Sequence, residues 1–576
     1  MWWTVRPHPA PTKGTTLPLL RRERSSRPRD HRSSRSARSV VLLTGAVLAA
    51  GALSAVVAAP ASAQPLAPTV PAVASIPTPP APVWGPCTNP TLSSRGAECS
   101  FVTVPKDYAD RSAGTIKLAI SRKSHTTANY QGVMLVNPGG PGGSGLIYSI
   151  LQPFVPGGAG QSYDWIGFDP RGVGSSVPAI RCDPSLLGFN RPDYRAVTLG
   201  LQRTWLARSE AYSKACAANT DLRLLRNMTT VDNARDMESI RLALGQSQIN
   251  YYGFSYGTYL GQVYATLYPS KLRRAVFDSN VDPTRVFYGS NLDQDQYFQT
   301  TTEKFFEWVA EYDSVYHLGT TGAAVSAFYY GTLDALSRTP QAGGRFGPDE
   351  WNDVVTPAGY YQLTWLDVAD VMAAAAQGNY APALAAYGTP DASKDNGFGA
   401  YNATQCTDAR WPTSYTNQWK PDALSYDAKY PFLTWSNVWY NAPCLTWPAP
   451  QKNPVAVDGS AAPPVLLIGE ELDAATPFSG SLTVRQLFPS SSLVGSPGGT
   501  SHAVSLNGVA CVDNTIATYL RNGSLPTRVA GNRADKNCKP APEPVPAGAA
   551  GKTATPGTAG LPVGAPGVAA RLTPAA

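Results

Sequence analysis

Residues that would suit a nucleic-acid or metal partner are scarce in this sequence. The net charge is +7, but 10 of the 47 basic residues and only 2 of the 40 acidic ones precede residue 64. The 37 Lys and Arg that follow are matched by 38 Asp and Glu and form no basic stripe, so we expect no nucleic-acid partner. None of the 8 cysteines lies in a C-x-x-C pair or beside a histidine, so we expect no metal.

Long apolar runs are also rare, and the clearest one lies near the N-terminus. Arg-rich residues up to Arg38 precede the apolar run 40–59, and the small residues Ala61-Ser62-Ala63 follow it. This order predicts an export signal over residues 1–63 and a mature, secreted chain that begins near Gln64. A single membrane anchor is the alternative. If the signal is cleaved, the mature chain keeps no membrane attachment.

All 8 cysteines follow the predicted signal. An even number of cysteines in an exported chain predicts disulfides, because the environment is oxidising. Many connectivities are possible, and the shorter loops favour pairing between neighbours in the sequence. The pairs are then Cys87 with Cys99, Cys182 with Cys216, Cys406 with Cys444, and Cys511 with Cys538.

Strand and helix patterns alternate through the body of the chain. Two half-exposed strands are expected at 101–108 and 114–123, and helices at 231–244 and 258–267. Short apolar runs typical of buried parallel strands follow the first two. Such alternation predicts an α/β fold with a mostly parallel, doubly wound sheet. The apolar runs are 133–136, 165–168, 249–252, 275–277, 465–468 and 493–494.

One long stretch, residues 283–460, interrupts this series between the sixth and seventh strands. It contains 8 of the 13 tryptophans and several helical patterns, so we expect a large, mainly helical cap over the carboxyl edge of the sheet. The core would then comprise residues 83–282 and 461–540. Residues 64–82 have the composition of a linker or propeptide, and 541–576 that of a disordered tail.

A G-x-S-x-G pentapeptide, residues 253–257, places Ser255 directly after the strand 249–252 and before a helix. In that strand-turn-helix setting the glycines permit a sharp turn that raises the serine hydroxyl above the sheet. An ordinary serine in a glycine-rich turn is the alternative. We predict that Ser255 is a nucleophile, as in the α/β-hydrolase fold.

A serine hydroxyl needs a base to remove its proton, and histidines are few. Three follow the predicted signal: His125, His317 and His502. The order serine, acid, histidine excludes His125, and His317 lies in the predicted cap, so His502 is the predicted base. Asp473, which follows the seventh strand, is the predicted acid that orients it. Asp278, at the end of the sixth strand, is the alternative acid.

Residues 137–145, with the sequence NPGGPGGSG, follow a predicted strand. In this fold that loop supplies one backbone N–H to the oxyanion, and the residue after the nucleophile supplies the other. We therefore predict Gly140 and Tyr256 as the oxyanion donors. The loop lacks the Gly-Lys-Ser/Thr ending of a phosphate-binding loop, and we expect no cofactor.

Four segments resemble secreted tripeptidyl aminopeptidases of actinomycetes and related prolyl-aminopeptidase-like hydrolases, and the resemblance extends from Cys87 to Cys538. It implies the triad Ser255, Asp473 and His502, and release of short peptides, three residues in this branch, from free N-termini through an acyl-enzyme. Asn137 stands where the wider group often has histidine, which favours the tripeptidyl branch. The four segments are 137–145, 169–176, 252–259 and 469–477.

Removal of an N-terminal peptide requires recognition of a free ammonium, so carboxylates should line the pocket. Glu470, Glu471, Asp293 and Asp295 are candidates by location, although each is as consistent with a solvated surface charge. We expect a monomer whose partners are peptide or protein N-termini. An esterase or lipase acting on small apolar esters, and a non-catalytic binding protein on the same fold, are the alternatives.

Overall fold

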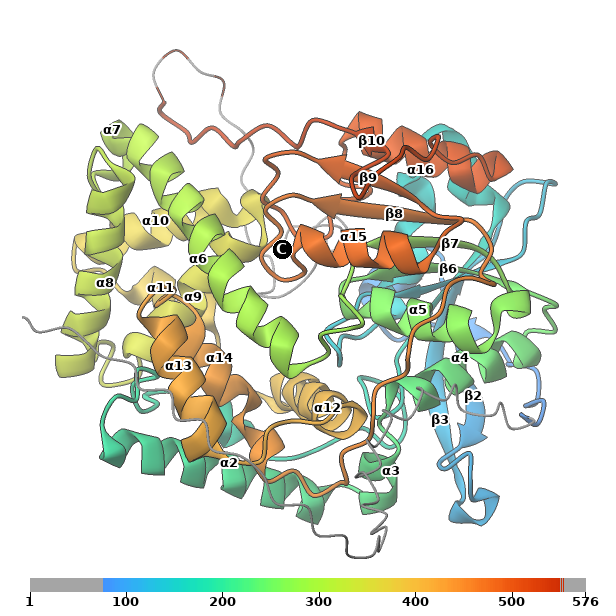
Figure 1. Ribbon diagram of the computed structural model, residues 1–576, viewed down its shortest axis with the longest axis horizontal. Helices are drawn as coiled ribbons and strands as arrows, with labels where there is room; N and C mark the ends of the chain where they lie inside the picture. The colour runs from blue at the N-terminus through green and yellow to red at the C-terminus, as the bar shows by residue number, and fades with distance from the viewer. Residues whose placement is uncertain (1–75, 550, 552, 554–576) are drawn as a thin grey trace, which may run out of the picture. The chain divides into compact units, whose positions relative to one another are not determined.

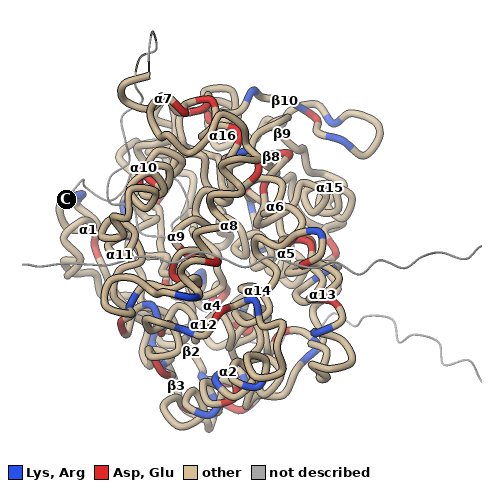
Figure 2. Tube along the Cα trace, turned by 90° about the vertical axis from the view of Figure 1, so that its left-hand side faces the viewer, with Lys and Arg blue, Asp and Glu red and all other residues tan. Residues whose placement is uncertain are grey.

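The computed structural model describes residues 76–549, 551 and 553 of the chain. The predicted export signal, most of the predicted linker and most of the predicted tail lie outside these residues. No helix in the described part is both long and apolar enough to cross a membrane. In the view of Figure 2, basic and acidic residues are interspersed along the trace.

The described residues form one sheet of ten strands, with the order β1-β2-β3-β5-β4-β6-β7-β8-β9-β10. The pairs β1–β2, β2–β3 and β3–β5 are antiparallel and the other neighbours are parallel. The predicted mostly parallel sheet is therefore confirmed, with two-residue strands added at each edge. The strands are β1 (Gly85–Pro86), β2 (Glu98–Pro105), β3 (Thr115–Lys123), β4 (Val133–Asn137), β5 (Asp164–Phe168), β6 (Ile249–Phe254), β7 (Leu272–Asp278), β8 (Val465–Glu470), β9 (Ser492–Ser496) and β10 (Lys536–Asn537).

Helices cover both faces of the sheet, as a doubly wound fold requires. On one face α4 (Thr230–Ala243), α5 (Tyr256–Leu267) and α15 (Phe478–Leu487) contribute to a hydrophobic cluster with one set of strand side chains. On the other face η2 (Leu146–Phe154) and α16 (Ala510–Asn522) pack against the alternate set. Strands β4, β6 and β8 are buried along their whole length, because both faces are covered.

The register of the parallel strands brings their carboxyl ends to one edge. Asn137 pairs with Gly253, Phe254 with Asp278, and Asp278 with Ile468. The loops that follow β4, β6, β7 and β8 therefore begin side by side. This edge is where ligands bind in open α/β sheets.

The predicted cap is present between β7 and β8, which are the sixth and seventh of the predicted strands. It is helical and has a hydrophobic cluster of its own, rich in tryptophan, tyrosine and phenylalanine. In Figure 1 its helices lie to the left of the sheet. They are α6 (Tyr288–Glu311), α7 (Asp313–Tyr316), α8 (Gly322–Arg338), α9 (Pro348–Tyr360), α10 (Trp365–Ala376), α11 (Ala381–Tyr387), α12 (Ala392–Asp408), α13 (Lys420–Asp427) and α14 (Thr434–Asn441).

A second segment joins the cap, and the sequence did not reveal it. Residues 183–227, with α2 (Leu199–Asn219) and α3 (Leu222–Arg226), lie between β5 and β6 and were predicted as part of the core. Instead, Arg191 pairs with Glu350 of α9, and the Tyr194 carbonyl accepts a hydrogen bond of 2.8 Å from Trp439 of α14. A helical pattern shows which face is apolar but not which partner covers it.

The first residues of the predicted tail are ordered against the cap. Trp308 Nε1 donates a hydrogen bond of 2.9 Å to the Pro544 carbonyl, and Val545 and Ala549 pack against the cap cluster. The prediction of disorder is therefore wrong for residues 541–549. Their composition cannot form a core, but it can cover an aromatic surface that already exists.

The 8 cysteines form four disulfides, Cys87–Cys99, Cys182–Cys216, Cys406–Cys444 and Cys511–Cys538. These are the predicted neighbour pairs. The second disulfide closes the segment that joins the cap, and the third links α12 to the end of the cap.

Candidate active site

The turn between β6 and α5 holds Ser255 in a backbone conformation that few residues adopt. Its φ is 55° and its ψ is −129°. A Cβ at Gly253 would lie 2.5 Å from the Gly257 carbonyl oxygen, and one at Gly257 would lie 2.5 Å from the Asn137 carbonyl oxygen. Both flanking glycines are thus required by close backbone contacts, which is the physical basis of the pentapeptide.

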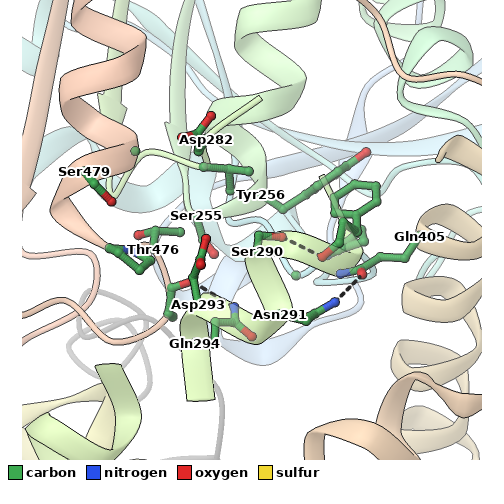
Figure 3. Close-up of a pocket in the computed structure, with 17 residues that line it drawn as sticks. Ser255, Tyr256, Asp282, Ser290, Asn291, Asp293, Gln294, Gln405, Thr476 and Ser479 are labelled. Carbon is green, nitrogen blue, oxygen red and sulfur yellow. Dashed lines mark hydrogen bonds between the residues drawn. The ribbon is translucent and has the colours of Figure 1, made fainter. Parts of the chain in front are cut away.

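The Ser255 side chain faces a cavity at the carboxyl edge of the sheet (Figure 3). Among the described residues its hydroxyl makes no hydrogen bond, and it is not in hydrogen-bond contact with His502. Thr476 lines the same cavity as Ser255, and its Oγ1 is 3.4 Å from His502 Nδ1. Catalytic hydrogen bonds are often long or unformed without substrate, so the missing contact does not exclude His502 as the base of Ser255.

His502 and Asp473 form a buried pair. His502 Nδ1 is 3.0 and 2.9 Å from the two carboxylate oxygens of Asp473, which is fully buried. The carboxylate also accepts hydrogen bonds of 2.9 Å from the backbone N–H of Ala475 and of Thr476, and from the Thr476 hydroxyl. These bonds fix Asp473 so that it can hold the imidazole with Nδ1 protonated and Nε2 free.

The alternative acid, Asp278, has another partner. Its carboxylate accepts hydrogen bonds of 2.8 and 2.5 Å from the backbone N–H and the hydroxyl of Ser505, three residues after the histidine. Burial raises the pKa of Asp278 to about 6. The structure therefore places Asp278 behind the histidine loop, and it places Asp473 against the imidazole.

The loop after β4 lies directly against the nucleophile turn. A Cβ at Gly139 would lie 2.5 Å from the Phe254 carbonyl oxygen and 2.8 Å from the Tyr256 nitrogen, so only glycine permits this approach. Gly140 and Tyr256 both line the cavity beside Ser255. Neither backbone N–H donates a hydrogen bond to another described residue, so both are available to an oxyanion.

Comparison with known proteins identifies the family. The sequence model of the alpha/beta hydrolase fold family matches residues 132–508. The chain belongs to the α/β-hydrolase family. A tripeptidyl aminopeptidase of Streptomyces coelicolor is 36% identical over 479 residues, which cover 80% of this chain and 87% of the relative. The chain is thus a serine hydrolase enzyme.

Two mycobacterial relatives of this hydrolase are more distant. The serine protease Hip1 of Mycobacterium tuberculosis is 28% identical over 478 residues, which cover 77% of this chain and 89% of the relative. A protein named carboxylesterase B from the same species is 30% identical over 473 residues, which cover 77% of this chain and 88% of the relative. The family therefore includes proteins named for peptide and for ester hydrolysis.

The cavity of the hydrolase at Ser255 is small, about 60 Å³. That volume holds no more than a few water molecules or one small side chain. Of the four carboxylates predicted to bind an ammonium, only Asp293 lines it, and Asp293 is engaged by the Arg285 guanidinium. Asp282, which the sequence analysis did not single out, also lines the cavity, but it accepts hydrogen bonds from Thr284 and Thr483.

The other three predicted carboxylates lie elsewhere. Glu470 is buried beneath the histidine loop, where its carboxyl accepts a hydrogen bond of 2.5 Å from the Ser501 N–H and burial raises its pKa to about 8. Glu471 is exposed and accepts a hydrogen bond from the Gly498 N–H. Asp295 is buried beside Asn437, and burial raises its pKa to about 8. Their position in the chain did not reveal the direction of their side chains.

The two excluded histidines are remote from this edge. His125 lies 2.7 Å from Asp164, which begins β5 at the amino side of the sheet. His317 is exposed at the end of α7.

Proposed function

We propose that this protein is a secreted aminopeptidase that removes three-residue peptides from free N-termini through an acyl-enzyme on Ser255. The observation that carries the proposal is the buried His502–Asp473 pair, together with Ser255 in a cavity that Gly140 and Tyr256 also line. The similarity to a tripeptidyl aminopeptidase over 80% of the chain favours a peptide substrate. Four disulfides and the predicted export signal favour a secreted protein.

The residues act in a definite order in this proposal. The Ser255 hydroxyl attacks the scissile carbonyl and gives its proton to His502 Nε2, while the carbonyl oxygen becomes an oxyanion bound by the N–H groups of Gly140 and Tyr256. The C–N bond then breaks, and the leaving amine takes the proton from His502. Water, deprotonated by His502, attacks the acyl-enzyme; the ester bond to Ser255 then breaks, the Ser255 oxygen takes the proton back from His502, and the peptide leaves as a carboxylic acid. Asp473 keeps the imidazole in the required tautomer throughout.

The test is a comparison of substrates on the secreted protein. We expect trialanine p-nitroanilide with a free amine to be cleaved at least tenfold more efficiently than its N-acetylated form, with the tripeptide as product. The Ser255→Ala variant is the matched control and should lack this activity. Equal cleavage of the acetylated form would contradict the aminopeptidase proposal.

The second candidate function is hydrolysis of small esters, favoured by the relative named carboxylesterase B. A series of p-nitrophenyl esters tests it in the same assay. Higher kcat/KM for the esters than for every peptide would favour this function. Absence of turnover on both series, with no labelling of Ser255 by an organophosphonate, would favour a binding protein.

A further inference from the structure

The cap contains a second cavity, larger than the one at Ser255. Its volume is about 330 Å³, within the range of about 300–1,000 Å³ that is typical of sites for small molecules. Its walls come from residues 193–195, one face of α8, the beginning of α9 and the start of α14, all of them within the cap or the segment that joins it (Figure 1). The two cavities share no lining residue.

Helix α9 separates this second cavity from the catalytic residues. Asp349, the second residue of α9, lines the cavity, whereas the carbonyl of Tyr360, the last residue, accepts a hydrogen bond of 2.8 Å from the His502 N–H. Eleven residues of α-helix span about 16 Å. The second cavity is therefore a place in the fold of its own and not a branch of the catalytic cavity.

Three buried residues in the walls each have a polar atom that makes no hydrogen bond with another described residue. The atoms are Asp349 Oδ2, Asn352 Oδ1 and Trp435 Nε1. The three residues are 1%, 5% and 2% exposed. Buried polar atoms almost always have a partner, so these atoms in the wall of a cavity call for a partner that enters it.

The three atoms together specify the group that would satisfy them. Asn352 Nδ2 donates hydrogen bonds of 2.7 and 2.9 Å within the cap, so its Oδ1 is left as an acceptor, whereas Trp435 Nε1 is a donor. Asp349 Oδ1 accepts the Tyr194 N–H, and burial raises the pKa of this carboxyl well above its ordinary value, so Oδ2 carries a proton and is also a donor. Two donors and one acceptor match an amide group, whose oxygen accepts two hydrogen bonds and whose N–H donates one.

The exposed end of the cavity carries negative charge that no cation neutralises. Asp334 is exposed and makes no ion pair within the described part of the chain. Asp193 accepts hydrogen bonds from the Ser337 hydroxyl and the Arg195 N–H, and these neutral donors leave its charge in place. The Arg195 guanidinium, which also lines the cavity, is paired with Asp427 at 3.3 Å. A cationic group is therefore attracted to this end.

Apolar side chains make up much of the remaining wall. They include the Phe432 ring, Leu333 and two prolines. The cavity thus offers hydrogen bonds for an amide group, a negative end for a cation and an apolar surface for a side chain. A short peptide with a free amino end combines these three features.

We propose that this cavity binds a short peptide with a free amino end, at a site distinct from the catalytic one. An amide group of the peptide bonds to Trp435, Asp349 and Asn352. The ammonium of the peptide lies near Asp193 and Asp334. This inference does not depend on the proposed reaction, because the cavity is separate from the catalytic serine.

The test measures the affinity of the full-length Ser255→Ala protein for phenylalanylalanylalanine amide by isothermal titration calorimetry. Adding Trp435→Phe removes one N–H donor but keeps an aromatic ring, so it should weaken binding about three- to tenfold. Trp447→Phe is the matched control, because its indole N–H is also buried without a partner among the described residues but lines neither cavity. Its affinity should equal that of the parent.

Two outcomes of this titration would overturn the inference. One is equal affinity of the Trp435→Phe and Trp447→Phe variants. The other is the absence of saturable binding to the parent at millimolar peptide, which would show that the cavity holds water alone. A protein that lacks peptidase activity but binds the peptide through Trp435 would refute the proposed function and keep this inference.

A second variant covers the case in which Trp435→Phe does not fold. Asp334→Asn changes an exposed residue and should lower the affinity for the free peptide about two- to fivefold, but not that for its N-acetylated form, which has no ammonium. Equal affinity of the parent for the two forms would overturn the inference. A substrate end and a released peptide share this chemistry; tighter binding of the form with a free carboxylate than of the amide would identify the released peptide as the ligand.

Discussion

The buried carboxyl of Glu470 provides a test of the site that does not depend on substrate. Glu470 lies at the end of β8, beneath the loop that carries His502, and it is 2% exposed. One oxygen accepts the Ser501 N–H, and the other has no hydrogen-bond partner among the described residues. Burial, together with the nearby Asp473 and Asp278, raises its pKa from 4.5 to about 8.

This pKa makes stability depend on pH with a definite sign. Between pH 4.5 and about 8 the unfolded carboxyl is ionised and the folded one is protonated, so stability falls as pH rises. The stability that the protonated Glu470 carboxyl contributes is fully present below the pKa of the unfolded state, and it is lost as the pH rises through the pKa of the folded state. At about 1.4 kcal/mol per pH unit, the whole window corresponds to about 5 kcal/mol as an upper limit.

The test uses the variant Glu470→Gln. The uncharged glutamine amide resembles the protonated carboxyl and keeps an oxygen that can accept the Ser501 N–H. Urea unfolding of both proteins from pH 4.5 to 9 measures the effect. Between pH 4.5 and 8 the free energy of unfolding should fall by about 1.4 kcal/mol per pH unit more in the wild type than in the variant. The variant should therefore be the more stable protein above pH 8. Peptidase activity of the variant should likewise persist at higher pH, since no charge forms beside Asp473.

Glu471→Gln is the matched control, because it makes the same substitution at the next residue along the chain, whose carboxyl is exposed. Its unfolding free energy should follow the wild-type pH dependence. If Glu470→Gln and the wild type lose stability at the same rate between pH 4.5 and 9, Glu470 is not protonated in the folded protein and the reasoning fails.

The remaining predictions concern the triad and the disulfides. Ser255→Ala should abolish labelling by an organophosphonate with little change in Tm; labelling that persists would identify another nucleophile. Asp473→Asn should lower kcat about ten-thousandfold, by analogy with other triads, whereas Asp278→Asn, which only loosens the Ser505 anchor, should cost at least a hundredfold less. Equal losses would return the acid role to Asp278. Removal of Cys182–Cys216 by paired alanine substitutions should lower the free energy of unfolding by about 2–4 kcal/mol, measured in urea; an unchanged value would show that α2 is held by its packing alone.

Much of the site was visible in the sequence because its requirements are local. The glycines at 253 and 257 are dictated by backbone contacts of 2.5 Å, and such contacts leave a readable motif. The order of Ser255, Asp473 and His502 follows from the succession of strands, so a scarce residue type, histidine, was enough to single out His502. The cysteine pairs were also close in the sequence, so short loops indicated the right partners.

The direction of individual side chains needed the tertiary structure. Glu470 and Asp473 are three residues apart at the end of the same strand, yet Glu470 accepts a hydrogen bond from the histidine loop and Asp473 contacts the imidazole. The partnership of residues 183–227 with the cap depends on contacts between segments more than 100 residues apart. The sequence by itself determined the sheet and the disulfides and singled out the candidate triad, because close backbone contacts, strand order and short disulfide loops can all be read from it. Only the tertiary structure decided which carboxylates line the cavity at Ser255, because that depends on how separate segments pack against one another.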